Sequence, residues 1–175
     1  MRPTRLIAAA LVTLVACQKP ETPEQTDARI AAESDSLRPH LEAVAASFAR
    51  HLAAGQVDSM ALLYAEDASL MPPNMPLVTG RDNVRATFQA MLSGGQFTPT
   101  LRVENVTANG PMAVERGRFV LAFTPTPGTP APAGVDSGNY LIHWHRSGGT
   151  WSIVEEMWNS ELPPPPPPPP ARRGS

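Results

Sequence analysis

The stretch GNYLIHWHRSGGTWSIVEEMWNS, Gly138 to Ser160, sets aromatic and β-branched residues on both sides of a glycine-containing turn. Two such runs joined by a short turn are typical of a β-hairpin. We therefore predict one strand over residues 136–145 and a second over residues 150–159. This hairpin is expected to close the domain, because eight consecutive prolines follow at Pro163 to Pro170.

Upstream of the hairpin, the hydrophobic residues take the spacing of helices before they take that of strands. The expected elements are, in chain order, a helix that begins near Ser36 and ends at Gly55, a shorter helix from Asp58 to Tyr64, a brief strand at residues 68–73, a third helix between Gly80 and Gly94, and strands at residues 98–108 and 112–124. The four longer strands are expected to form one antiparallel meander. Three helices followed by a curved antiparallel sheet give an α+β domain, which we place at residues 37–160.

The charge balance excludes one class of partner. The chain has a net charge of −2, and its sequence holds no basic run interleaved with aromatic residues. Nucleic-acid-binding domains carry such a basic patch. We therefore expect no nucleic-acid partner.

The first seventeen residues, MRPTRLIAAALVTLVAC, combine basic Arg2 and Arg5 with an apolar run too short to span a bilayer. Residues 14–17, LVAC, resemble the lipobox of bacterial lipoproteins. This resemblance implies a signal peptide at residues 1–16 and a lipid on Cys17, the only cysteine. The expected location is the bacterial cell envelope, on the outer membrane facing the periplasm if the host has two membranes. The alternative is an ordinary secretory signal with an incidental cysteine.

The segments on either side of the domain have biased compositions. Residues 17–36 are polar and acidic, so we expect the lipidated cysteine and a flexible tether there, with at most a short helix near residues 27–33. Residues 161–175 form a polyproline tail. Its prolines favour an extended polyproline II rod that acts as a spacer, and a ligand for an aromatic groove is the alternative.

Two segments carry a family resemblance. Residues 62–92, LLYAEDASLMPPNMPLVTGRDNVRATFQAML, followed by residues 138–160, resemble the SnoaL-like and ketosteroid-isomerase-like superfamily. The patterns Y-x-x-D-A, P-P-N, G-R and W-N-S resemble a branch of it without assigned activity. The resemblance implies a cone-shaped nuclear transport factor two-like fold, in which three N-terminal helices pack on a curved antiparallel sheet.

The resemblance also locates positions where catalytic groups would be expected. Ketosteroid isomerase uses an aspartate base and an oxyanion pair of tyrosine and carboxylic acid. The matching positions fall near Pro72, Phe48 and Leu141, and none of these side chains can transfer a proton. We therefore expect a cavity that binds a small, mostly hydrophobic molecule without transforming it, and no cofactor. The expected ligand-binding residues are Phe48, Tyr64, Met71, Phe88, Met91 and Trp158.

The orientation of the last strand follows from Trp158, which matches a pocket-lining aromatic of the superfamily. By alternation, Ser152, Val154 and Glu156 are expected to face inward with it. Trp151, Ile153 and Met157 would then face outward, on a surface suited to a homodimer.

His143 and His145 lie two residues apart and share one face of their strand. A four-residue loop from Arg146 to Gly149 would turn them inward beside Ser152, and an odd-length loop would turn Tyr140, Ile142 and Trp144 inward instead. Inward histidines would allow a metal, with Glu115 or Glu156 as a third ligand, but we expect no metal. The alternative function is an isomerase, dehydratase or cyclase that uses His143 or Glu156 as its acid or base. A structural role, with the prolines and the outer sheet face recruiting envelope partners, is a third hypothesis.

Overall fold

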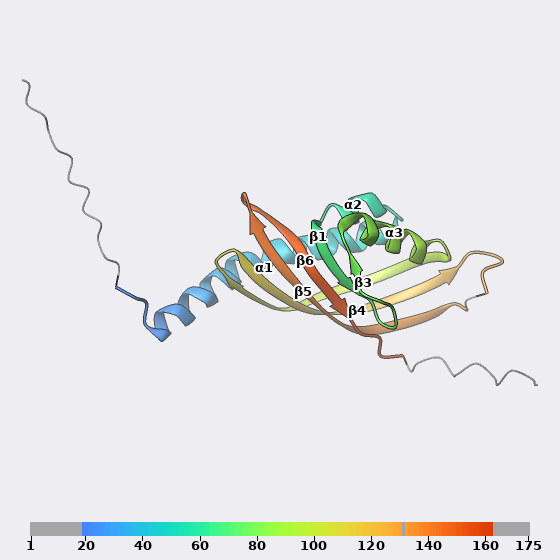
Figure 1. Cartoon of the computed structure of the whole chain (residues 1–175). Coiled ribbons are helices and arrows are strands. Elements are labelled where there is room, and N and C mark those ends of the chain that lie inside the picture. The colour runs from blue at the N-terminus through green and yellow to red at the C-terminus, as the bar shows by residue number, and fades with distance from the viewer. Residues whose placement is uncertain (1–18, 131, 163–175) are drawn as a thin grey trace, which may run out of the picture.

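The computed structural model describes residues 19–130 and 132–162. The predicted signal peptide, the predicted lipidation site Cys17 and the prolines 163–170 lie outside these residues. The described chain forms three helices and six strands, with the helices on one face of a curved sheet (Figure 1). The elements are, in chain order, α1 (Pro23–Ala53), α2 (Val57–Ala61), β1 (Tyr64–Met71), β2 (Val78–Thr79), α3 (Arg81–Leu92), β3 (Gly95–Asn109), β4 (Met112–Pro125), β5 (Gly134–Ser147) and β6 (Thr150–Trp158).

The sheet has the strand order β2-β1-β6-β5-β4-β3. The antiparallel meander predicted for β3 to β6 is confirmed. However, β1 pairs with β6 in parallel, and the backbone N–H of Ile153 donates to the carbonyl of Leu63 at 2.8 Å. The sheet is therefore mixed, and the prediction of a wholly antiparallel sheet is wrong at this edge. Strand β6 is the last strand of the meander, so β1 pairs with the edge of β6 that β5 does not use. The chain that connects β1 to β6 contains β2, α3 and strands β3 to β5.

Helix α1 is much longer than predicted. It begins with a capping box, in which the Thr22 hydroxyl and the Gln25 side chain satisfy each other's backbone N–H groups. Its first turns are also held to the sheet, because the Glu33 carboxylate accepts from the backbone N–H of Gly110 at 2.7 Å. The prediction of a flexible tether is therefore wrong from Pro23 to Ser36. In the described part of the chain no helix, α1 included, is long and apolar enough to cross a membrane.

The other helix boundaries show which helix ends can be predicted from local sequence signals. Gly55 follows α1 with a φ of +67°, the left-handed conformation that glycine permits, and the predicted end is confirmed. Helix α3 begins after Gly80 as predicted. Helix α2 ends at Ala61, and Tyr64 belongs to β1 because it pairs with Ile153.

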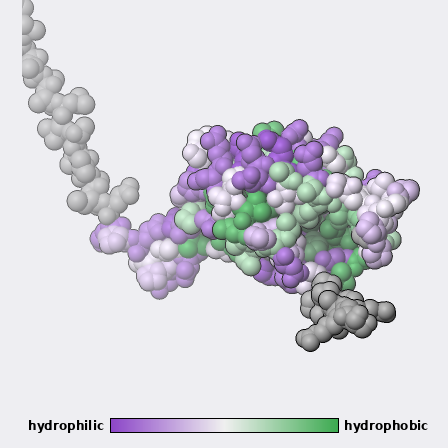
Figure 2. All heavy atoms as spheres, turned by 45° about the vertical axis from the view of Figure 1, so that its right-hand side comes forward, coloured by the Kyte–Doolittle hydropathy of each residue, from purple (hydrophilic) through white to green (hydrophobic). Residues whose placement is uncertain are grey.

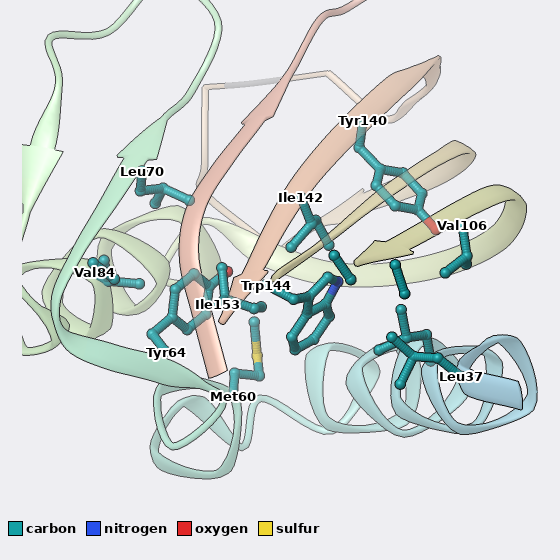
Figure 3. Packing of buried hydrophobic residues seen from close by; sticks show 14 of the residues in the cluster. Leu37, Met60, Tyr64, Leu70, Val84, Val106, Tyr140, Ile142, Trp144 and Ile153 are labelled. Carbon is teal, nitrogen blue, oxygen red and sulfur yellow. The ribbon is translucent and has the colours of Figure 1, made fainter. Parts of the chain in front are cut away.

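The core lies between the helices and the concave face of the sheet. Helix α1 contributes Leu41, α3 contributes Val84, and both are fully buried. In Figure 3, Tyr140, Ile142 and Trp144 point from β5 toward the helices. This packing leaves a cavity between the helices and the concave face, and the candidate site is built there.

Candidate functional site

Strand β5 decides which side chains reach the concave face. Tyr140, Ile142 and Trp144 are 6%, 9% and 2% exposed, whereas His143 and His145 lie on the opposite face. A two-residue turn, Gly148-Gly149, joins β5 to β6, and both glycines have positive φ. The loop is even in length, yet the histidines face outward, so the loop rule used for the sequence fails here.

A β-bulge in β6 explains the failure. His143 pairs with Glu155 and Trp144 pairs with Ile153, so Val154 is an extra residue without a partner. The bulge brings Ile153 to the concave face along with Glu156 and Trp158. The inward prediction is therefore right for Glu156 and Trp158 and wrong for Ser152, which pairs with the outward-facing His145. The outward prediction is wrong for Ile153, and also for Trp151, which packs against the core.

A cavity of about 110 Å³ lies between α1, α3 and the concave face. Because one water needs only about 10–15 Å³ of such space, the cavity has room for a small organic molecule. Figure 2 shows hydrophobic atoms gathered on one face of the molecule, with hydrophilic atoms around them. The cavity wall comprises Val44, Ala45, Phe48, Leu52, Leu63, Phe88, Met91, Leu92, Phe97, Pro99, Leu101, Glu115, Phe119, Leu121, Tyr140, Ile142, Trp144, Ile153, Glu156 and Trp158.

Four of the six predicted ligand-binding residues lie in this wall: Phe48, Phe88, Met91 and Trp158. Tyr64 lies behind the wall, fully buried, and contacts two wall residues, Glu156 and Phe88. Met71 is not part of the wall. It pairs with Met157, whose side chain is 45% exposed on the outer face, so the prediction for Met71 is wrong.

Glu156 places a carboxyl group in the wall of this apolar cavity. Its Oε2 accepts a hydrogen bond from the hydroxyl of Tyr64. Removal from water raises the pKa of Glu156 to about 7, the hydrogen bond from Tyr64 acts in the opposite direction, and the charge of Glu115 adds to the increase. Burial likewise raises the pKa of Tyr64, so this hydroxyl remains a donor.

Glu115 supplies a second carboxyl group, which is 1% exposed. Its Oε1 accepts from the Tyr140 hydroxyl at 2.8 Å, and its Oε2 accepts from Trp144 Nε1 at 3.0 Å. Burial raises the pKa of Glu115, while these two hydrogen bonds lower it. Sequence reasoning considered Glu115 only as a metal ligand. Its place opposite the aromatic residues of β5 is the signal that could have identified it.

The two carboxyl groups belong to one row across the sheet. Glu115 pairs with Ile142, and Ile142 pairs with Glu156 on its other side. Since neighbouring strands lie about 4.8 Å apart, their Cα atoms are separated by roughly 10 Å. The concave face therefore presents two carboxyl groups and their tyrosine donors at the floor of one cavity.

This arrangement contradicts the expectation of a cavity without proton-transfer groups. Leu141 lies on the outer face and Phe48 is apolar, so neither supplies a proton-transfer group, but the chain places its acidic groups at other positions. Among the earlier candidates, Glu156 is in the cavity. His143 is not in the cavity: it lies on the outer face, where its Nδ1 is 3.1 Å from Oε2 of Glu155. Within residues 19–130 and 132–162, no group of three His, Cys, Asp or Glu side chains could hold a metal ion.

The chain was compared with known proteins. A family described as "SnoaL-like domain" matches residues 44–155. No curated protein matches the chain. A ketosteroid isomerase-like protein from Erwinia carotovora atroseptica aligns with a TM-score of 0.62 and 17% identity, covering 70% of this chain and 94% of that one. A candidate scytalone dehydratase from Novosphingobium aromaticivorans has a TM-score of 0.63 and 17% identity, with coverage of 75% and 89%.

A third solved structure, a nuclear transport factor two-like protein with a cystatin-like fold, also comes from Novosphingobium aromaticivorans. It aligns with a TM-score of 0.59 and 18% identity, covering 79% of this chain and 89% of that chain. At these identities the likeness concerns the fold alone. The fold is thus a cystatin-like one, with a long N-terminal helix packed on a six-stranded mixed sheet.

Proposed function

The chain belongs to the SnoaL-like domain family, and on that premise we propose that its cavity binds a small, largely hydrophobic molecule and transfers a proton on it through Glu156. One observation carries the proposal: Glu156, which accepts a hydrogen bond from Tyr64, is one of two carboxyl groups in a largely apolar cavity wall. Such a carboxyl group is a typical general acid or base.

The proposed chemistry uses Glu156 twice. The ionised carboxylate takes a proton from a carbon next to a carbonyl group, and the protonated acid returns it to the same molecule. Return to another carbon gives an isomerisation, and return to a leaving hydroxyl group releases water and forms a double bond. A pKa of about 7 suits both steps, because acid and base are both populated near neutral pH. One structural neighbour is named as a candidate dehydratase, in line with the second outcome.

The test is deuterium exchange with the full chain. Small β-hydroxy ketones that carry an apolar ring, such as 4-hydroxy-4-phenylbutan-2-one, are incubated in D₂O and followed by proton NMR. We expect exchange next to the carbonyl group, or loss of water, above the rate in buffer, rising with pH until it levels above about pH 7 as Glu156 ionises. Rates equal to those in buffer would contradict the proposal. Binding seen by saturation transfer without exchange would favour the second candidate function, binding alone, to which the apolar wall is equally suited.

Anchoring in the cell envelope through a lipid on Cys17 stays a proposal that depends on residues 14–17. We expect the wild-type chain to incorporate labelled palmitate in bacteria and a Cys17→Ser variant to incorporate none. Equal labelling of the two chains would exclude this anchor.

A homodimer through the outer sheet face is also a proposal. Val114, Leu141 and Met157 are 40%, 40% and 45% exposed on that face, which supports an apolar contact. We expect light scattering to give twice the chain mass, and Leu141→Glu to reduce it to one chain. A wild-type chain that is monomeric at high concentration would exclude the dimer.

A further inference from the structure

Within the described residues, the wall of the cavity contains acidic side chains but no basic ones. Two of its lining side chains, Glu115 and Glu156, are carboxylic acids, and none of the lining residues in the described chain is Lys, Arg or His. Buried carboxylates are normally paired with a cation because the loss of hydration is costly. Here the partners are neutral hydroxyl and indole groups. A ligand that carries positive charge would supply what the protein lacks.

The hydrogen bonds at the floor of the cavity also favour a ligand that donates hydrogen bonds. The hydroxyl of Tyr140 and the indole N–H of Trp144 are both used by Glu115, and the hydroxyl of Tyr64 is used by Glu156. Oε1 of Glu156 has no hydrogen-bond partner within the described residues. The ionised site therefore presents a free acceptor, and the ligand must bring the donor.

The cavity wall includes one further N–H donor, which neither glutamate uses. Trp158 lies in the wall, and among the described residues its indole N–H has no hydrogen-bond acceptor. It is a single neutral donor, whereas a bound carboxylate would meet two acidic groups at low dielectric, where like charges repel strongly. Trp158 can therefore assist a carbonyl ligand but cannot make the cavity favourable to an anion.

We propose that the cavity selects small apolar molecules whose polar end donates hydrogen bonds, a protonated amine or a hydroxyl group, and rejects carboxylates. A protonated amine would bind most tightly, because it donates to Glu156 and also offsets the negative charge. The aromatic rings of Phe48 and Phe88 lie in the same wall and favour an apolar body behind the cation. This inference rests on the proposed function only in taking the same cavity as the ligand site.

The test compares four molecules of one shape with the full chain: cyclohexylamine, cyclohexanol, cyclohexanone and cyclohexanecarboxylate. Affinities are measured by calorimetry or ligand-observed NMR at pH 8, where Glu156 is ionised. We expect the amine to bind at least about tenfold more tightly than the ketone, the alcohol to lie between them, and the carboxylate to bind least. Equal affinities, tighter binding of the carboxylate or no binding of any probe would overturn the proposal.

Three variants assign the selectivity to its source. Glu156→Gln should remove the preference for the amine over the alcohol. Glu115→Gln adds an amide N–H donor and frees the indole N–H of Trp144 from its acceptor. This variant should therefore bind the ketone more tightly than the wild-type chain does. Trp158→Phe should weaken the binding of the ketone more than that of the amine. If Glu115→Gln fails to fold, the wild-type ranking and Glu156→Gln decide. The probes are compared by affinity and the deuterium assay by exchange, so a failure of catalysis leaves this binding result standing, and the reverse also holds.

Discussion

Replacing Glu156 by glutamine is expected to lower the rate of deuterium exchange or water loss by about 10²–10⁴-fold, the usual contribution of a general acid or base. Glutamine keeps the shape of the side chain and still accepts the hydrogen bond from Tyr64. It cannot take a proton, so the dependence of the rate on pH near 7 should disappear with the rate itself.

Glu155→Gln is the matched control for this variant. Glu155 is the next residue in β6, carries the same carboxyl group and points to the outer face, where it contacts His143 at 3.1 Å. We expect its rate to equal that of the wild-type chain. If the two variants lose activity equally, or if both keep it, Glu156 is not the acid or base.

The stability of the Glu156→Gln variant should separate lost chemistry from lost structure. Burial raises the pKa of Glu156 from 4.5 to about 7, so the folded protein holds this proton more tightly than the unfolded chain. The stability that this contributes is fully present below about pH 4.5 and is lost as the pH rises toward 7. In urea denaturation we therefore expect the variant to match the wild-type chain at pH 4 and to be more stable at pH 8.

Replacing Gly117 by alanine is expected to lower the free energy of unfolding by about 1–3 kcal/mol, as overpacking does. An added Cβ would lie 2.3 Å from the hydroxyl of Tyr140 and 2.4 Å from the carbonyl oxygen of Arg102. The backbone oxygen cannot move easily, so the tyrosine ring, whose hydroxyl donates to Glu115, must shift. We therefore expect slower turnover or altered ligand affinity as well, because the floor of the cavity is rearranged.

Gly134→Ala provides the comparison for Gly117→Ala. Gly134 also lies in the sheet, in β5, but an added Cβ would meet nothing within 4 Å. Its free energy of unfolding should change by less than about 0.5 kcal/mol. If the two alanine variants unfold at the same urea concentration, the close packing of Tyr140 over Gly117 is not a stabilising contact.

The parts of the fold that the sequence predicted depend on local signals. The β5–β6 hairpin turns at two glycines, helix α3 lies between two glycines, and both elements occur where the sequence predicted them. The start of α1 was missed because its first turns are polar. They are stabilised by a capping box and by contacts with the distant β3–β4 turn, such as that of Glu33 with Gly110. The parallel pairing of β1 was missed because it joins segments far apart in the chain.

The candidate site was predicted only in part, for related reasons. Alternation counted back from Trp158 gave the correct face for Glu156, but it could not reveal the bulge at Val154 that reverses the faces beyond it. Glu115 was missed because its role depends on the register of β4 against β5, which brings it next to Tyr140 and Trp144. The resemblance to ketosteroid isomerase directed attention to acids at fixed positions, whereas this chain has its acids elsewhere on the concave face.

The central claim is that Glu156 is a desolvated carboxyl group with a proton to exchange at neutral pH. The most direct measurement is a carbon NMR titration of the glutamate side-chain carboxyl groups in the full chain, with the Glu156 signal assigned from its absence in Glu156→Gln. A midpoint about 7 is predicted. A midpoint near the ordinary value of 4.5 would show that Glu156 is ionised and hydrated throughout the neutral range, and would contradict the account.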